Sequence, residues 1–337
     1  MSRIGTIQLQ ALNDSPSYAN PFADGFSLDA LDAAIESRLD LIETWLDHAG
    51  ENIIDLVVTT EDLTGLGMAM TYLDDPDIFR SVVKSSSQAA ESRLAEAARR
   101  NKIHIVACYY EADGDLIYNV AVLFDRQGAV IGKYRKVHLP VYESWLVTAG
   151  DSFPVFETDI GRIGMTICYD QMWPEATAAC ALNGAEIVCL PSAASPEIFR
   201  LQTRALDNQV FIVSSHSDHS LIAAPNGEVL ANAEDTPEGI VWADIKITEA
   251  TTSGEHFFDY LYSGIRDHKE RHLKHRRPVA YAPLTNSSPP LANYYPASAV
   301  ESAEAKQLVY AEHKAEMLRQ LKNEQHHWHW RWQGDPS

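Results

Sequence analysis

Short apolar and β-branched runs recur along the first 245 residues and predict β-strands. Many of these runs lack strict alternation of apolar and polar positions, so we expect sheets that are covered on both faces. Turn-forming residues, such as Pro225-Asn226-Gly227, separate hairpin-like strands. The predicted strands are residues 4–8, 54–59, 103–109, 117–124, 162–167, 186–190, 210–214 and 240–245.

Helical patterns lie between the predicted strands. Apolar residues recur at spacings of three and four from Leu28 to Leu46, with Ser27 placed to cap the start and Gly50 to end the helix. Further helices are predicted at about 78–100, at 175–182 and at 198–208. Because strands and helices alternate throughout, the sequence predicts a layered α/β domain with helices outside sheets.

The character of the chain changes after residue 246. Residues 251–300 are polar, with a basic run at 271–277 and a proline-rich stretch at 283–296, and they predict an extended arm. Residues 301–325 predict a helix with a thin apolar line, which we expect to dock on the main core or on a partner subunit. The predicted organisation is a main domain over 1–250 and a C-terminal arm and helix over 251–337.

Charge and hydropathy exclude two classes of function. The 337 residues include 47 acidic and 27 basic ones, for a net charge of −20, and no Lys/Arg-rich stripe stands out. Such a chain repels the phosphate backbone, so we expect no nucleic-acid partner. The first residues do not show the basic region followed by an apolar region that is typical of a signal peptide. No apolar run approaches the ~20 residues of a membrane span. We therefore expect a soluble cytoplasmic protein without a membrane partner.

The four cysteines show no metal-binding spacing, and we expect no metal and no cofactor. Cys108, Cys180 and Cys189 lie in apolar stretches, which favours a structural role as reduced thiols. Cys168 instead ends an apolar run just before Pro174 and its predicted helix. Because a helix N-terminus favours the thiolate, this turn suits a nucleophile. The alternative is that Cys168 is another small buried hydrophobe.

Two further reactive side chains follow predicted strands. Glu61 comes after the strand at 54–59, and Lys136 lies in the run 132–140 after another apolar segment. A cysteine nucleophile needs a base for its proton, and acyl transfer needs a positive group where oxyanion charge develops. Glu, Lys and Cys meet both needs, although each charge taken alone is more often a solvated surface group.

Three ordered motifs surround these residues: 55–58 with Glu61, 132–139 around Lys136, and 164–170 around Cys168 with 173–175. Together they resemble the nitrilase superfamily of carbon–nitrogen hydrolases, over roughly residues 1–245. The resemblance implies a four-layer αββα sandwich of the nitrilase type followed by a C-terminal extension, and assembly as a homodimer or a higher homo-oligomer.

The resemblance also implies a role for each catalytic candidate. Glu61 would act as general base and then as acid, and Cys168 would form a thioester. Lys136, with the backbone N–H of Tyr169, would stabilise the oxyanion. Glu143 resembles the family's second glutamate, which orients the lysine and the substrate. The mechanism has no role for His138, which we expect to hold its loop by a hydrogen bond.

The substrate is predicted only as a class. The residues Tyr169-Asp170 after the nucleophile look like the amidase and carbamoylase branches, so we expect hydrolysis of a small amide or N-carbamoyl compound. A nitrilase, an acyl transferase and a non-catalytic oligomeric scaffold remain alternatives. The His- and Trp-rich tail at 326–330 favours a surface or subunit contact over a metal site. The predicted substrate-binding residues are Tyr142, Trp145, Tyr169, Gln171, Trp173 and Ala193.

Overall fold

The structure is a computed structural model of the whole chain. It describes residues 1–9, 27–66, 76–140, 143–194, 196–234, 239–247 and 268–286. The described residues up to 247 lie in one compact unit, and residues 268–286 lie in a second.

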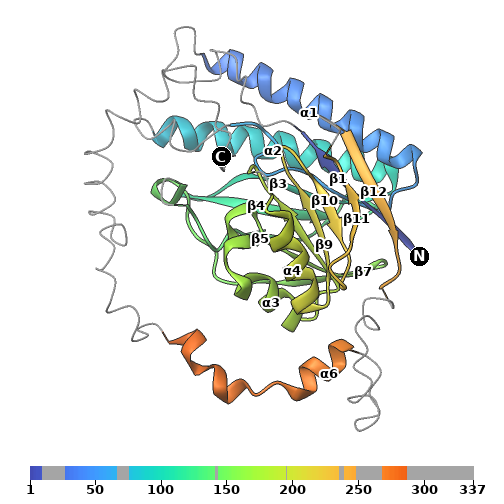
Figure 1. Cartoon of the computed structure of the whole chain (residues 1–337). Helices are drawn as coiled ribbons and strands as arrows, with labels where there is room; N and C mark the ends of the chain where they lie inside the picture. Colours follow the sequence, from blue (N-terminus) through green and yellow to red (C-terminus); the bar gives the residue numbers. More distant parts are fainter. Residues whose placement is uncertain are drawn as a thin grey trace, which may run out of the picture. The chain divides into compact units, whose positions relative to one another are not determined.

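The first unit contains two six-stranded sheets (Figure 1). In the first sheet, three neighbouring strands are parallel, and the strands that flank them are antiparallel. Their order across the sheet is β12 (Gly239–Ile245), β1 (Ser2–Gln8), β2 (Leu56–Val58), β3 (His104–Asp113), β4 (Leu116–Phe124) and β5 (Val130–Arg135).

The second sheet repeats this pattern of pairing, although the sequence shows no internal repeat. Its three parallel strands are again flanked by antiparallel ones. The strands β6, β10 and β11 were not predicted, because they are short and two of them are partly exposed. The order across the sheet is β11 (Val229–Asn232), β10 (Leu221–Ala223), β9 (Phe211–Ser215), β8 (Ile187–Pro191), β7 (Gly161–Met165) and β6 (Val155–Thr158).

Four of the predicted helices are present, as α1 (Leu28–Glu51), α2 (Pro76–Asn101), α3 (Pro174–Leu182) and α4 (Ile198–Asn208). Ser27 caps α1, because its side chain accepts a hydrogen bond from the Ala30 N–H at 3.1 Å. Gly50 does not end α1, which continues to Glu51. A Cβ at Gly50 would lie 2.4 Å from the side-chain oxygen of Asn101, so glycine here permits close approach of the two helices.

Three apolar clusters fill the spaces between four layers. The first lies between helices α1 and α2 and the first sheet, the second between the two sheets, and the third between the second sheet and helices α3 and α4. Figure 1 shows the two helix pairs on opposite sides of the strands. The predicted αββα sandwich is therefore confirmed, and the continuous burial of strands such as β8 and β9 follows from cover on both faces.

The second unit corrects the prediction of an extended arm. Its described residues form helix α6 (His268–His275) and the 3-10 segment η6 (Pro278–Thr285). An ion pair of 2.5 Å between Glu270 and Lys274, four residues apart, stabilises α6. The predicted helix at 301–325 and the tail at 326–330 lie outside the described residues, and the boundary near residue 250 stays a prediction. No helix within the described ranges is both long and apolar enough to cross a membrane.

Candidate active site

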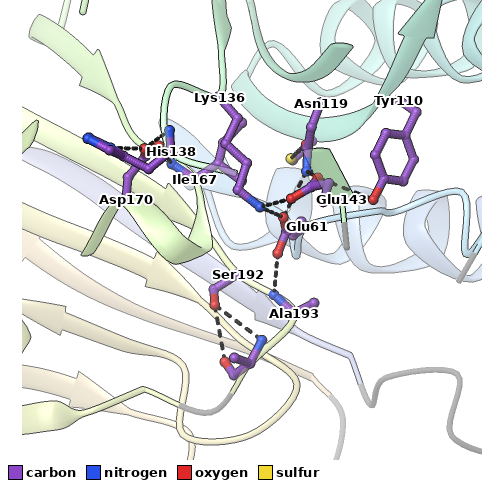
Figure 2. A network of polar contacts seen from close by, with 12 residues as sticks. Glu61, Tyr110, Asn119, Lys136, His138, Glu143, Ile167, Asp170, Ser192 and Ala193 are labelled. Atoms are coloured by element: carbon purple, nitrogen blue, oxygen red, sulfur yellow. Dashed lines mark hydrogen bonds and ion pairs between the residues drawn. The ribbon is translucent and has the colours of Figure 1, made fainter. Parts of the chain in front are cut away.

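The side chains of Glu61, Lys136 and Glu143 meet in one buried cluster (Figure 2). Glu61 follows β2, Lys136 directly follows β5, and Glu143 begins the 3-10 turn η3 (Glu143–Trp145). The Lys136 Nζ lies 2.7 Å from Glu61 Oε1 and 2.7 Å from Glu143 Oε2. The exposed fractions are only 7% for Glu61 and 2% for each of the other two, so water screens these ion pairs weakly.

The surroundings of Glu61 favour its charged form. Burial alone would raise the pKa of this carboxyl, but the charge and hydrogen bond of Lys136 outweigh burial and lower it. The backbone N–H of Ala193, in the loop after β8, donates to Glu61 Oε2 at 3.0 Å and acts in the same direction. Glu61 is therefore held as a carboxylate, the form that a general base needs.

Lys136 and Glu143 respond differently to burial. Burial favours neutral Lys136, but the neighbouring charges of Glu143 and Glu61 raise the pKa of its ammonium well above the usual value. The pKa of Glu143 is raised by burial and, against the effect of Lys136, by the charge of Glu61. The cluster thus contains a lysine that stays positive and two carboxyls whose pKa values are pushed apart.

The Cys168 thiol lies next to this cluster, close enough that the carboxyl of Glu61 and the hydroxyl of Ser192 affect its pKa. The backbone of Cys168 has a φ of 41°, in the left-handed region that non-glycine residues seldom adopt. Cys168 opens the short 3-10 turn η4 (Cys168–Met172), and α3 begins only at Pro174. The sharp turn after β7 is thus strained, as is common at functional sites.

The expectation that a helix N-terminus favours the Cys168 thiolate is wrong for the resting protein. Burial, followed by the charge of Glu61, raises the pKa of this thiol to about 12. The α-helix starts only at Pro174, six residues later, so its N-terminus does not lie at this thiol. A thiol with this pKa carries its proton at neutral pH.

Hydrogen bonds to Asp170 stabilise the turn that contains Cys168. Asp170 is fully buried, and its Oδ2 accepts hydrogen bonds from the Ile167 N–H at 2.8 Å and from the Tyr134 hydroxyl at 2.6 Å. Its Oδ1 accepts from His138, which confirms that His138 holds its loop by a hydrogen bond. Figure 2 shows this contact beside Lys136.

Asn119 on β4 is a residue of this site that the sequence did not predict. Its Nδ2 donates to Glu61 Oε1 at 2.8 Å and to Glu143 Oε1 at 2.7 Å. The Cys108 thiol, predicted to be only structural, donates to Asn119 Oδ1 at 3.2 Å, and the Tyr110 hydroxyl donates to Glu143 Oε1 at 3.4 Å. One polar amide inside the apolar run 117–124 was the signal that could have revealed this residue, since buried amides need partners. Cys180 and Cys189 are buried free thiols.

The predicted substrate-binding residues are only partly described. Tyr142 and the side chain of Trp145 lie outside the described part of the chain. Tyr169 packs edge-on against Trp173 at 4.8 Å between ring centroids, and Trp173 stacks on His138 at 4.1 Å. Ala193 reaches the site through its backbone N–H.

Gln171 is buried, and its Oε1 has no hydrogen-bond partner among the described residues. A ligand group with an N–H or O–H donor would satisfy such an oxygen. Within the described ranges, no three His, Cys, Asp or Glu side chains are arranged to hold a metal ion.

Comparisons with known proteins agree with this geometry. The sequence profile of the family described as Carbon-nitrogen hydrolase matches residues 33–253. A nitrilase from Pyrococcus abyssi is 34% identical over 184 residues, which cover 51% of this chain and 70% of that protein. The Homo sapiens omega-amidase NIT2 is 32% identical over 182 residues, which cover 46% of this chain and 66% of that protein.

Solved structures share the fold. An amidase from Nesterenkonia sp. superposes with a TM-score of 0.63 at 22% identity, covering 83% of this chain and 95% of that one. A carbon-nitrogen hydrolase from Helicobacter pylori G27 gives a TM-score of 0.63 at 21% identity, covering 85% and 99%. The resemblance to the nitrilase superfamily is confirmed, and this chain belongs to the carbon–nitrogen hydrolase family.

Proposed function

We propose that the protein hydrolyses the carbon–nitrogen bond of a small amide or N-carbamoyl compound through a thioester on Cys168. The observation that carries this proposal is the position of Glu61. Its carboxylate lies 2.7 Å from the Lys136 ammonium and close enough to the Cys168 thiol to raise the pKa of that thiol. A base, a nucleophile and a fixed positive charge thus share one site, as acyl transfer requires.

In the first half of the reaction, Glu61 takes the thiol proton while the sulfur attacks the carbonyl carbon. This coupling matters because the thiol has a pKa of about 12 and is almost wholly protonated at neutral pH. The protonated Glu61 then gives its proton to the departing nitrogen. In the second half, Glu61 removes a proton from water, which attacks the thioester carbon; the C–S bond breaks, the acid is released, and Glu61 returns the proton to the sulfur.

Lys136 supplies the charge that stabilises the tetrahedral intermediate. Two of its three N–H donors go to Glu61 and Glu143, and the third can serve a developing oxyanion. The backbone N–H of Tyr169 lies in the first turn of η4, where helix N–H groups have no partner within the helix. Glu143 keeps the lysine in place, since its Oε2 accepts the second of these bonds.

The choice of an amide over a nitrile rests on the residues Tyr169-Asp170 after the nucleophile. The relatives include both a nitrilase and omega-amidases, so the same site supports a nitrilase as the alternative. A panel of primary amides, N-carbamoyl amino acids and nitriles, scored for ammonia release, tests the proposal. Release from amides or carbamoyl compounds is expected, and it should be lost in Cys168→Ala and Glu61→Gln. Nitriles that react faster than their matching amides would overturn the preference.

Two alternative functions, acyl transfer and a non-catalytic scaffold, can be tested separately. Acyl transfer to an amine would appear as an amide or hydroxamate product when an amine or hydroxylamine is added. A non-catalytic scaffold would leave Cys168 no more reactive toward iodoacetamide at neutral pH than Cys180. Mass spectrometry of the alkylated protein separates the two thiols.

We also propose that the protein is a homodimer or a higher homo-oligomer, with residues 251–337 packing on the partner subunit. Large apolar side chains on α4 support this assembly, because Phe199 is 81% exposed and Leu206 is 48% exposed. Analytical ultracentrifugation of the full chain, with Phe199→Asp as the disrupting variant, tests it. We expect small-molecule substrates and a cytoplasmic location, in keeping with the sequence analysis.

A further inference from the structure

Among the described side chains, only Lys136 and Asn119 donate hydrogen bonds to both Glu61 and Glu143. Asn119 lies on β4 directly opposite Tyr110 of β3, so their side chains share one face of the sheet. Its backbone oxygen also accepts a hydrogen bond from the Lys136 N–H at 2.9 Å. One residue thus touches three of the groups that the proposed mechanism uses.

We propose that Asn119 is a positioning residue that fixes the rotation of the Glu61 carboxylate and so directs the Cys168 proton to Glu61 Oε2. This inference rests on the proposed function, because it assigns a role within the same acid–base step. It also predicts that loss of the amide changes the chemistry of the site and not only its stability.

The distribution of donors around Glu61 carries the argument. Oε1 accepts two hydrogen bonds, from the Lys136 ammonium at 2.7 Å and from the Asn119 amide at 2.8 Å. Oε2 accepts one described hydrogen bond, from the Ala193 N–H at 3.0 Å. Because the two donors occupy Oε1, Oε2 is the oxygen with room to take a proton from the thiol.

The amide is itself held in one orientation. Both Nδ2 hydrogens go to carboxylate oxygens, one on Glu61 and one on Glu143. The Cys108 thiol donates to Oδ1 at 3.2 Å, and a flipped amide would place Oδ1 against two carboxylates and Nδ2 against a thiol donor. Cys108 therefore selects the orientation in which Asn119 can serve as a double donor.

The test removes the amide in two ways, with Asn119→Ala and with Asn119→Leu, which nearly keeps the volume. Loss of a hydrogen bond to the ionised carboxyl raises the pKa of Glu61, so the acid limb of kcat/KM should move upward by about one pH unit. We also expect kcat/KM to fall by about 10- to 100-fold at neutral pH. Asn208→Ala, which removes a half-buried amide on α4, is the matched control and should not move the limb.

Cys108 provides an independent pair of variants. Cys108→Ala removes the donor to Asn119 Oδ1 and should move the acid limb in the same direction by a smaller amount. Cys108→Ser restores a donor and should recover most of that shift. This pair decides the matter if neither Asn119 variant folds, and a shift of equal size in both Cys108 variants would overturn the proposal.

A second readout separates this inference from the proposed function. The rate of Cys168 alkylation by iodoacetamide between about pH 3 and pH 8 reports the Glu61–Cys168 pair without any substrate. Its acid limb should move with Asn119→Leu even if no tested amide is hydrolysed. An unchanged limb in a folded Asn119→Leu protein would overturn the role of Asn119, whether or not the wild type releases ammonia.

Discussion

Asp170 accepts two hydrogen bonds from His138, one from its backbone N–H at 3.0 Å and one from its Nδ1 at 2.8 Å. Asp170 lies two residues after Cys168, and His138 lies two residues after Lys136. The turn with Cys168 and the loop with Lys136 are therefore joined through one buried carboxyl group. A disturbance of Asp170 should reach both catalytic candidates together.

Asp170→Asn tests this relationship. The amide replaces an acceptor with a donor that faces other donors, so we expect the free energy of unfolding to fall by about 2–4 kcal/mol. In the fraction that stays folded, ammonia release should also fall, because Lys136 and Cys168 lose their shared anchor. Urea unfolding and initial rates measure the two effects. Asp207→Asn, at an exposed position on α4, is the control, and equal effects in both variants would contradict the prediction.

Glu61→Gln should lower both the pKa of the Cys168 thiol and the catalytic rate, although a lower pKa makes the thiolate more available. Since the charge of Glu61 helps to raise the pKa of Cys168, its removal should lower that pKa below about 12. Ammonia release should nevertheless fall by at least about 100-fold, because no base remains. A titration of thiolate absorbance, with Cys168→Ser as the blank, measures the pKa. An unchanged thiol pKa in Glu61→Gln would show that burial alone governs it.

His216 should make stability depend on pH. Burial lowers the pKa of His216 to about 4, and its Nδ1 must carry a proton to donate to the Ala194 carbonyl oxygen. The unfolded chain, with an ordinary pKa near ~6.5, binds the proton more readily. The free energy of unfolding is thus unaffected by His216 above about pH 6.5. It falls by up to about 3 kcal/mol as the pH falls toward 4, because the unfolded chain then binds the proton.

Urea unfolding at several pH values between 4 and 7 measures this dependence. In His216→Asn the free energy of unfolding should vary less across this window. His275→Asn changes an exposed histidine on α6 and should keep the wild-type slope. A wild-type slope in His216→Asn would exclude this residue as the source.

Arg93 should contribute to stability more than an arginine in a local pair. Its guanidinium on α2 contacts three carboxylates on α1, namely Glu36 at 2.8 Å and Asp40 and Glu43 at 2.5 Å each. Arg93→Ala leaves three negative charges facing one another, so we expect a loss of about 1–2 kcal/mol that shrinks in high salt.

Arg99→Ala is the matched variant, since Arg99 pairs only with Glu96 of the same helix among the described contacts. The expected loss there is about 0.3–0.5 kcal/mol. Thermal unfolding at low and high salt compares the two variants. Equal losses at Arg93 and Arg99 would show that the contact between helices adds nothing.

The main elements and the catalytic candidates could be predicted from the sequence, because their signals are local. The helix over Leu28–Glu51 shows its period directly, and strand ends mark where Glu61, Lys136 and Cys168 emerge. The resemblance then linked these three positions, which are far apart along the chain. The structure brings them together, while their catalytic roles stay proposals.

The features that the sequence did not predict depend on contacts between residues that are far apart along the chain. Asn119 acquires its meaning only when β4 places it between Glu61 and Glu143. The raised pKa of Cys168 comes from burial and from Glu61, which is close in space but far away along the chain. The sequence suggested only the effect of a helix terminus. The helix α6 lies in a polar stretch without an apolar period, where charge pairing rather than burial supports it.

The apolar layer between the two sheets has a consequence for turnover. Glu61 and Lys136 extend from the first sheet and Cys168 from the second, so the thickness of this layer sets the distance between the Glu61 carboxyl and the Cys168 sulfur. Facing sheets pack about 10 Å apart. Catalytic groups must keep their relative positions to well within about 1 Å for a reaction to occur. A bulkier or smaller side chain at Val58 or Met165 would change that gap. Catalysis in such a variant should fail before the fold does.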